Sequence, residues 1–114
     1  MLFVEIKCRS ALTDLSARAD TDAQMRRRFL QLYSKAPKTL RGISAFGSRL
    51  CLYTLEKRVN QIFPPQVPNS ETFIIDVAPQ DRWDIDIMSD AGYNKVVELV
   101  NECMEVVEEI EAPV

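Results

Sequence analysis

The stretch that decides the fold is Leu2-Phe3-Val4-Glu5-Ile6-Lys7-Cys8. Side chains alternate across an extended chain, so the even-numbered apolar residues share one face and Phe3, Glu5 and Lys7 share the other. This period of two, with β-branched residues, predicts a β-strand over residues 2–8. The charged pair beside Phe3 indicates that the second face is not simply core.

Two further strands are expected at residues 40–46 and 49–56. They flank Gly47-Ser48, and a glycine at the first of two turn residues suits a type II′ hairpin. Gly42 inside the first of these strands predicts a bulge or a close approach of another group to the backbone.

The first helix is expected over residues 21–36. Thr21 and Gln24 match a capping box. In this motif the threonine side chain accepts from the backbone N–H of the glutamine, and the glutamine side chain accepts from the backbone N–H of the threonine. Pro37 would end the helix. Residues 9–20 are polar and are predicted to form a loop or a short turn.

The second half of the chain is less regular. Three prolines within residues 57–70 predict a connector without regular structure. Residues 71–77 are expected to form a short strand, and residues 82–87 an extended segment with one apolar face. Within it, Trp83 is interpreted as a core residue rather than as a platform for stacking bases.

A last helix is expected to begin near Ser89 or Asp90. Apolar residues recur at helical spacing through the glutamate-rich C-terminal region, and this stripe extends further than a small sheet can cover. We expect Val100, Met104 and Val107 of the stripe to form an interface.

These elements predict an α+β or α/β domain. A small mixed sheet of three to four strands would be packed by two main helices, with one sheet face thinly covered. Because thinly covered apolar surface favours association, we expect a homo-oligomer or binding of a protein partner. The 114 residues are expected to form one domain, residues 1–114.

Composition limits the possible functions. The chain is 46% hydrophobic and 27% charged, which is typical of a globular domain, and no apolar run is long enough for a membrane span. It contains no histidine, which excludes histidine-based triads and histidine zinc sites. Three widely spaced cysteines suit a reducing compartment, so an intracellular location in cytoplasm or nucleus is expected. They are interpreted as small core residues.

The charges are divided unevenly along the chain. Residues 1–60 hold 12 Lys and Arg and 5 Asp and Glu, a net +7, whereas residues 61–114 hold 2 and 12, a net −10. The two halves could attract each other, within one chain or across a dimer. The alternative is a basic surface for an anionic partner.

The Arg26-Arg27-Arg28 run is the candidate nucleic-acid contact. Consecutive helical residues fan around the axis, so the three side chains cannot all face one phosphate backbone. The alternative is a solvated helix face, or a contact with the acidic C-terminal helix.

Glu5-x-Lys7 is the one pattern that suggests chemistry. A carboxylate on a strand can hold a hard divalent cation, and a lysine two residues later points to the same side and can stabilise a developing phosphorane. A strand with two solvent-facing charges produces the same spacing by chance.

The wider succession resembles the second half of PD-(D/E)XK nuclease-like domains, as in proteins of mushroom-forming fungi. In that pattern a Glu-x-Lys strand precedes a helix with glutamine, a strand with glycine, and a strand that ends in an aromatic residue. The matching segments here are Phe3–Lys7, Ala23–Met25, Arg41–Gly47, Leu50–Tyr53 and Ala78–Trp83.

The resemblance implies catalytic roles for Glu5, Lys7 and Gln24, with Glu5 as a metal ligand if a second carboxylate is supplied. The pattern also has a metal-binding Asp on a strand before Glu-x-Lys, and this sequence holds no such strand before Glu5, so the N-terminal elements of the full fold are expected to be missing. The substitutes that the sequence offers are Asp76, Asp84 and Asp86.

The leading expectation is therefore a non-catalytic, nuclease-like domain without a cofactor that acts by self-association or partner binding. The first alternative is an Mg²⁺- or Mn²⁺-dependent nuclease whose site is completed across a dimer. The second is a nucleic-acid-binding module without catalysis.

Overall fold

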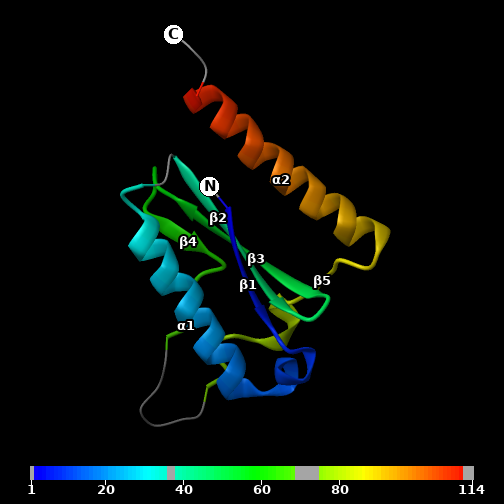
Figure 1. The fold of residues 1–114 in the computed structure, drawn as a ribbon. Coiled ribbons are helices and arrows are strands. Elements are labelled where there is room, and N and C mark those ends of the chain that lie inside the picture. The colour runs from blue at the N-terminus through cyan, green and yellow to red at the C-terminus, as the bar shows by residue number, and fades with distance from the viewer. Residues whose placement is uncertain (1, 36–37, 69–74, 112–114) are drawn as a thin grey trace.

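The computed structural model describes residues 2–35, 38–68 and 75–111, with side chains as far as Cys103. The elements in chain order are β1 (Leu2–Lys7), η1 (Arg9–Thr13), α1 (Leu15–Leu32), β2 (Thr39–Phe46), β3 (Arg49–Glu56), β4 (Gln61–Phe63), η2 (Gln80–Arg82), β5 (Ile85–Asp86) and α2 (Asp90–Glu111). Figure 1 shows one sheet with α1 and α2 on opposite sides of it. The α+β prediction is confirmed.

The sheet is mixed and runs β1-β2-β3-β4, with β5 also paired to β3. β1 is parallel to β2, because α1 carries the chain back across the sheet between them. β2 and β3 form the predicted hairpin, with Phe46 opposite Arg49. Gly47 has φ of 60°, which the first position of a type II′ turn requires.

Gly42 is a site of close approach rather than a bulge. The pairing of β2 with β3 continues through it without an extra residue. A Cβ added there would lie 2.8 Å from Met25 Cε and 2.9 Å from Phe3 Cζ. The glycine therefore lets α1 and β1 pack directly against the β2 backbone.

The alternation of each strand divides the apolar residues between two clusters. The larger cluster lies on the α1 face, where Phe29 packs edge-on against Phe3 with ring centroids 5.1 Å apart, and Trp83 against Phe46 at 5.2 Å. Trp83 is buried there, and its Nε1 donates to Ser44 Oγ, 3.3 Å away. The expectation that Trp83 is a core residue is confirmed.

The α2 face carries the smaller cluster, which is built around Leu99 of α2. Its other buried members are Ile43, Ala45 and Leu50. Arg41, on the same face, reaches Glu102 of α2 at 3.1 Å. Among the described side chains, the acidic helix is therefore paired with a basic residue of β2 and not with the Arg26-Arg27-Arg28 run.

The predicted start of the first helix is wrong. α1 begins at Leu15 and ends at Leu32, and its N-cap is Asp14, which accepts from the backbone N–H groups of Ser16 and Ala17. Thr21 is buried in the middle of the helix. Since tertiary contacts stabilise the additional turns, the local capping-box pattern at Thr21 is not used.

The connector contains regular structure, contrary to the prediction. β4 pairs with β3 over Gln61–Phe63, before the prolines begin. Within the expected strand 71–77, residues 71–74 lie outside the described residues and residues 75–77 form no strand. The extended segment at 82–87 contains the short strand β5.

α2 begins at Asp90, as predicted. Of the expected interface residues, Val100 is 36% exposed, while the side chains of Met104 and Val107 lie outside the described part of the chain. Within that part, no helix has both the length and the apolar character needed to cross a membrane.

Candidate functional site

Glu5 and Gln24, which the sequence singled out, line one open pocket of about 420 Å³. Glu5 comes from β1, and α1 supplies the rest of the lining, which consists of Gln24, Arg27, Arg28 and Gln31. Gln24, Arg28 and Gln31 stand four and three residues apart, so they lie along one face of α1, and Arg27 lies beside this row. β1 and α1 thus bring a carboxylate opposite a row of amides and guanidinium groups.

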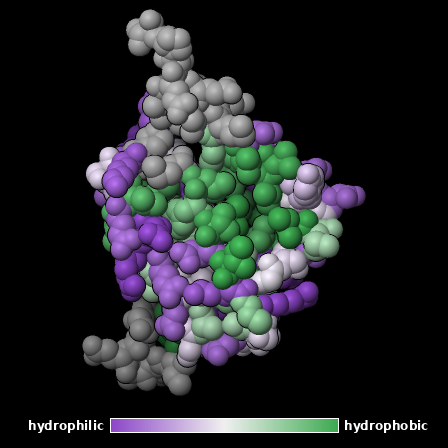
Figure 2. Space-filling view, in the orientation of Figure 1, coloured by the Kyte–Doolittle hydropathy of each residue, from purple (hydrophilic) through white to green (hydrophobic). Residues whose placement is uncertain are grey.

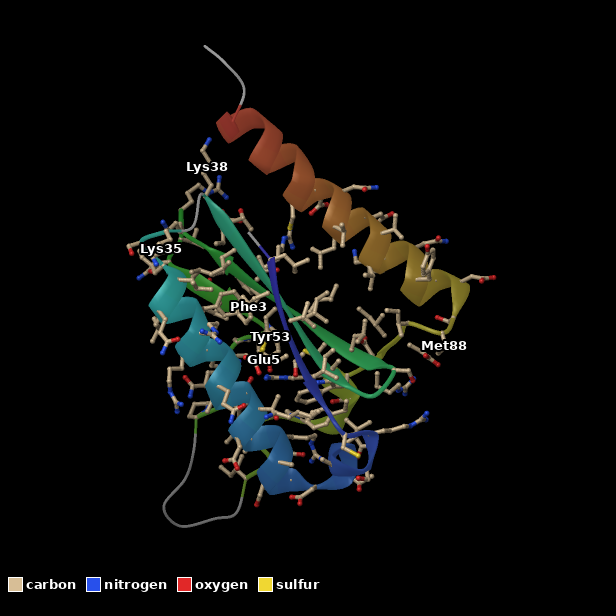
Figure 3. All side chains as sticks on the ribbon, viewed as in Figure 1. Phe3, Glu5, Lys35, Lys38, Tyr53 and Met88 are labelled. Atoms are coloured by element: carbon tan, nitrogen blue, oxygen red, sulfur yellow. The ribbon has the colours of Figure 1, made fainter. Side chains whose placement is uncertain are left out.

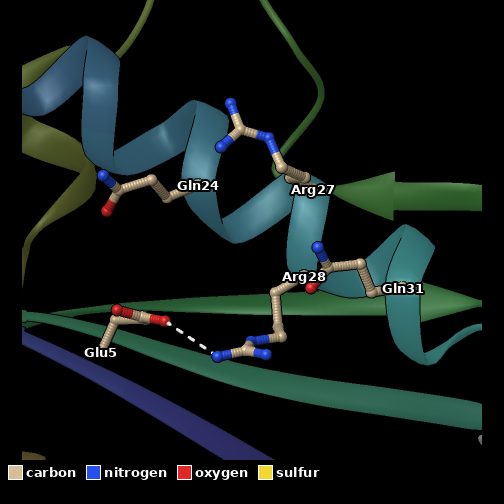
Figure 4. Close-up of a pocket in the computed structure, with 5 residues that line it drawn as sticks. All are labelled: Glu5, Gln24, Arg27, Arg28 and Gln31. Atoms are coloured by element: carbon tan, nitrogen blue, oxygen red, sulfur yellow. Dashed lines mark ion pairs between the residues drawn. The ribbon is translucent and has the colours of Figure 1, made fainter.

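Arg28 forms an ion pair with Glu5 in this pocket. Its Nη2 lies 4.0 Å from Glu5 Oε1, and the two side chains are 50% and 29% exposed. Figure 4 shows Arg28 reaching toward Glu5, while Arg27 points away from it. An ion pair this long and this exposed contributes little to stability, so both groups remain available to another ligand.

Lys7 lies on the same face of β1 as Glu5, as predicted, but it does not line the pocket. Its Cα is paired with Phe46 at the hairpin end of β2, and its carbonyl oxygen accepts from Gly47 N at 3.0 Å. The structure therefore brings Glu5 and Gln24 together and leaves Lys7 one step further along the strand.

A buried polar cluster that includes Tyr53 of β3 (Figure 3) holds α1 against the sheet. Tyr53 Oη of β3 donates to Asp22 Oδ1 at 2.6 Å, and Arg26 Nε donates to Asp22 Oδ2 at 2.9 Å. Arg26 also lies over the Tyr53 ring, 5.7 Å from its centroid. Burial raises the pKa of Tyr53 well above its usual range, and the hydrogen bond to Asp22 raises it further.

This cluster corrects one prediction about the arginine run. Arg26 is 9% exposed, and its Nη2 donates to the Pro64 carbonyl oxygen at 2.8 Å, so it is not available to a nucleic acid. Arg27 and Arg28 are exposed and do face outward. Of the three arginines, only these two stay candidates for contact with an anion.

Arg18 ties the start of α1 to two distant segments. Its guanidinium donates to the carbonyl oxygens of Leu12 at 2.7 Å and Ala78 at 2.9 Å, and to Asp76 Oδ2 at 2.7 Å. Asp76, one of the carboxylates considered as a metal ligand, is therefore engaged by an arginine on another part of α1.

The lining of the pocket does not fit a divalent cation. Mg²⁺ is held by oxygen ligands, usually carboxylates, in near-octahedral geometry. The described lining has one carboxylate, that of Glu5, and its charged neighbours there are arginines. Asp84 and Asp86 line a different pocket beside the start of α2. Among the described residues, no three acidic, cysteine or histidine side chains lie close enough together to hold a metal ion.

Gln31 is the lining residue that the sequence reasoning missed. Gln24, Arg28 and Gln31 stand at positions i, i+4 and i+7, so a search for polar residues at helical spacing from Gln24 would have found it. The same search at helical spacing would also have found the ion pair between Asp22 and Arg26, which are four residues apart.

The three cysteines have different environments. Cys51 is buried in the α1-side cluster, as predicted, and burial raises its pKa to about 12. Cys8 is exposed and corrects the expectation of a core residue. Its Sγ lies 3.2 Å from Ser10 Oγ, and this side-chain hydrogen bond lowers the Cys8 pKa. Cys103 is partly exposed.

Comparisons with protein-family models, with curated proteins and with solved structures returned no match for this chain.

Proposed function

We propose that the chain is a nuclease-like domain that does not cleave nucleic acid by itself and that acts through association with a protein surface. The nuclease-like part of the proposal rests on the resemblance of the Glu5-x-Lys7 strand, the Gln24 helix and the hairpin to that pattern. Association is the part that the geometry of the chain supports most directly.

The observation that carries the proposal is exposed apolar surface on β1. Val4 is 50% exposed and Ile6 is 73% exposed, although both belong to the α2 face of the sheet. Figure 2 shows hydrophobic side chains gathered at the centre of the viewed face. Exposed apolar surface of this kind is typical of protein interaction sites.

The make-up of the pocket supports the absence of cleavage by the chain alone. Hydrolysis assisted by a divalent ion needs carboxylates that hold the ion beside the attacked phosphate. Glu5 has a guanidinium as its neighbour instead of a second carboxylate. A nuclease whose site is completed across a dimer stays open as the alternative, since a partner could bring the missing group.

Two measurements test the proposal. DNA and RNA, single- and double-stranded, should remain uncut by the wild-type chain with Mg²⁺ or Mn²⁺, and the Glu5→Gln variant should give the same result. Cleavage that disappears in both Glu5→Gln and Lys7→Met would overturn the proposal and favour the composite nuclease.

Sedimentation velocity at micromolar concentrations should show association that Ile6→Asp weakens. Leu30→Asp is the matched control, because Leu30 is 70% exposed but lies on α1, on the other side of the sheet. A monomer that is indifferent to Ile6→Asp would remove the observation on which the proposal stands.

A second candidate function is binding of a phosphodiester backbone in the pocket. The specific observation in its favour is that Arg27, Arg28 and the two glutamines outnumber the single carboxylate. Guanidinium groups donate to phosphate oxygens, and such binding weakens steeply with salt. Labelled single-stranded RNA should bind Arg27→Ala/Arg28→Ala more weakly than a Lys95→Ala control, and equal binding would exclude this candidate.

A further inference from the structure

β1 has one unpaired edge within the described part of the chain, since its recorded partner is β2. The bond from Gly47 N to the Lys7 carbonyl oxygen shows that the Lys7 backbone faces β2. Successive residues of a strand turn their N–H and C=O groups to opposite edges. The backbone groups of Leu2, Val4 and Ile6 therefore point to the open edge, where they can pair with another strand.

The same strand exposes apolar side chains on one face and charges on the other. Val4 and Ile6 lie on the α2 face and are largely exposed. Glu5 and Lys7 lie on the α1 face, and no ion pair is recorded for Lys7 among the described residues. A strand laid along this edge would thus have to match both an apolar face and a Glu-x-Lys pair.

A second copy of β1 meets both requirements in one register. In an antiparallel pair of identical strands, residues whose backbones face the shared edge must stand opposite one another, which leaves few registers. With Val4 opposite Ile6, Glu5 would face Glu5 of the second copy. With Val4 opposite Val4, Glu5 would face Phe3.

With Ile6 opposite Ile6, each Glu5 faces Lys7 of the second copy. The two Glu5–Lys7 pairs occupy non-hydrogen-bonded positions of the antiparallel ladder, where side chains of the two strands approach most closely. Charge complementarity therefore selects this register over the other two. A two-fold rotation about Ile6, the residue between the two charges, therefore brings each glutamate opposite a lysine.

We propose that β1 pairs antiparallel with β1 of a second copy of this chain, with Ile6 on the two-fold axis. The inference rests on the proposed function and names the partner. It covers the open edge from Val4 onward, together with the exposed Val4 and Ile6 side chains, and it joins the two sheets into one. Opposite each Glu5 it places a lysine rather than a carboxylate, so this dimer does not complete a metal site.

Disulfide trapping tests the register. In a Cys8→Ser/Cys103→Ser background, which leaves only the buried Cys51, Ile6→Cys places two identical cysteines opposite one another on the axis. Val4→Cys is the matched control, because in this register Val4 faces residue 8 of the second copy. Directly opposite strand residues have Cα separations that a disulfide can span.

The expected result is oxidative cross-linking of Ile6→Cys to a dimer, with little cross-linking of Val4→Cys. Cross-linking of Val4→Cys alone overturns the proposal in favour of the Val4-centred register. Association without cross-linking of either variant also overturns it, because the contact is then on another surface, while the proposed function stands. A chain that stays monomeric in sedimentation overturns both.

Charge reversal gives an independent readout that does not use cysteines. Glu5→Lys should raise the dissociation constant of the dimer roughly tenfold, since two attractive pairs become repulsive. The double variant Glu5→Lys/Lys7→Glu restores both pairs and should recover the affinity. Equal affinities of the single and double variants would contradict the register.

Discussion

Replacing Tyr53 with phenylalanine removes one hydroxyl from the buried cluster that Tyr53 forms with Asp22 and Arg26. Tyr53 is fully buried, and its Oη donates at 2.6 Å to Asp22, which is 2% exposed. Phenylalanine fills the same space, so no cavity forms. Asp22 keeps the bond from Arg26 but loses one of the two side-chain donors that it has among the described residues.

The expected loss of stability is about 2 kcal/mol, because a buried hydrogen bond to a charged group contributes about 1.5–3 kcal/mol. A small protein unfolds in urea with a slope of about 2 kcal/mol per M, so the midpoint should fall by about 1 M. Fluorescence reports unfolding directly, because Trp83 is the one tryptophan and is buried.

Tyr93→Phe is the matched control. Tyr93 lies on α2 and is 60% exposed, so the same chemical change there should shift stability by less than about 0.5 kcal/mol. Equal midpoints for Tyr53→Phe and Tyr93→Phe would refute the argument that the hydroxyl stabilises a buried carboxylate.

The pKa of Tyr53 adds a pH dependence to this comparison. Because that pKa is raised above the usual 10.0 in the folded state, the unfolded chain releases the phenolic proton first. The stabilising contribution is complete below pH 10.0 and is lost as the pH rises beyond it. The difference between the wild type and Tyr53→Phe should therefore shrink in that alkaline range.

Three further substitutions or reactions check other parts of the fold. Arg18→Lys should lower the free energy of unfolding by about 2–3 kcal/mol, because one ammonium cannot reproduce three divergent guanidinium bonds; an unchanged urea midpoint would contradict this. Gly92→Ala should lower the thermal midpoint although alanine favours helices by about 1 kcal/mol, because its Cβ would overlap the Asp86 carbonyl oxygen; a raised midpoint would show that the contact relaxes. A thiol reagent at neutral pH should modify Cys8 rapidly and Cys51 only on unfolding, and mass spectrometry of the labelled peptides would reveal the reverse order.

Several elements could be predicted because their signals are local. Alternation over residues 2–8 indicated β1, and the glycine of Gly47-Ser48 indicated the hairpin with its turn. Apolar residues at helical spacing indicated α2, and its start was predicted near Ser89 or Asp90. In each case the signal lies within a few neighbouring residues, and the structure has the element that this signal indicates.

The start of α1 has two local cap patterns, at Asp14 and at Thr21, and the local signal does not choose between them. Its first turns are stabilised by Arg18, whose acceptors include Ala78 and Asp76, about sixty residues further along the chain. β4 was missed for a similar reason, since only its pairing with β3 distinguishes Gln61–Phe63 from a proline-rich connector. Contacts of this range leave no local pattern in the sequence.

The sequence by itself determined that Glu5 and Lys7 share one face of a strand and that Ile6 takes the other, because side chains alternate along any extended chain. Only the tertiary structure decided which neighbours those faces meet. Because α1 crosses over β1, Glu5 lies next to Gln24 and Arg28 and not, within the described lining, next to a second carboxylate. The position of α2 left Ile6 exposed beside an open edge. Periodicity is a property of neighbouring residues, whereas the partner of a face depends on how distant segments pack.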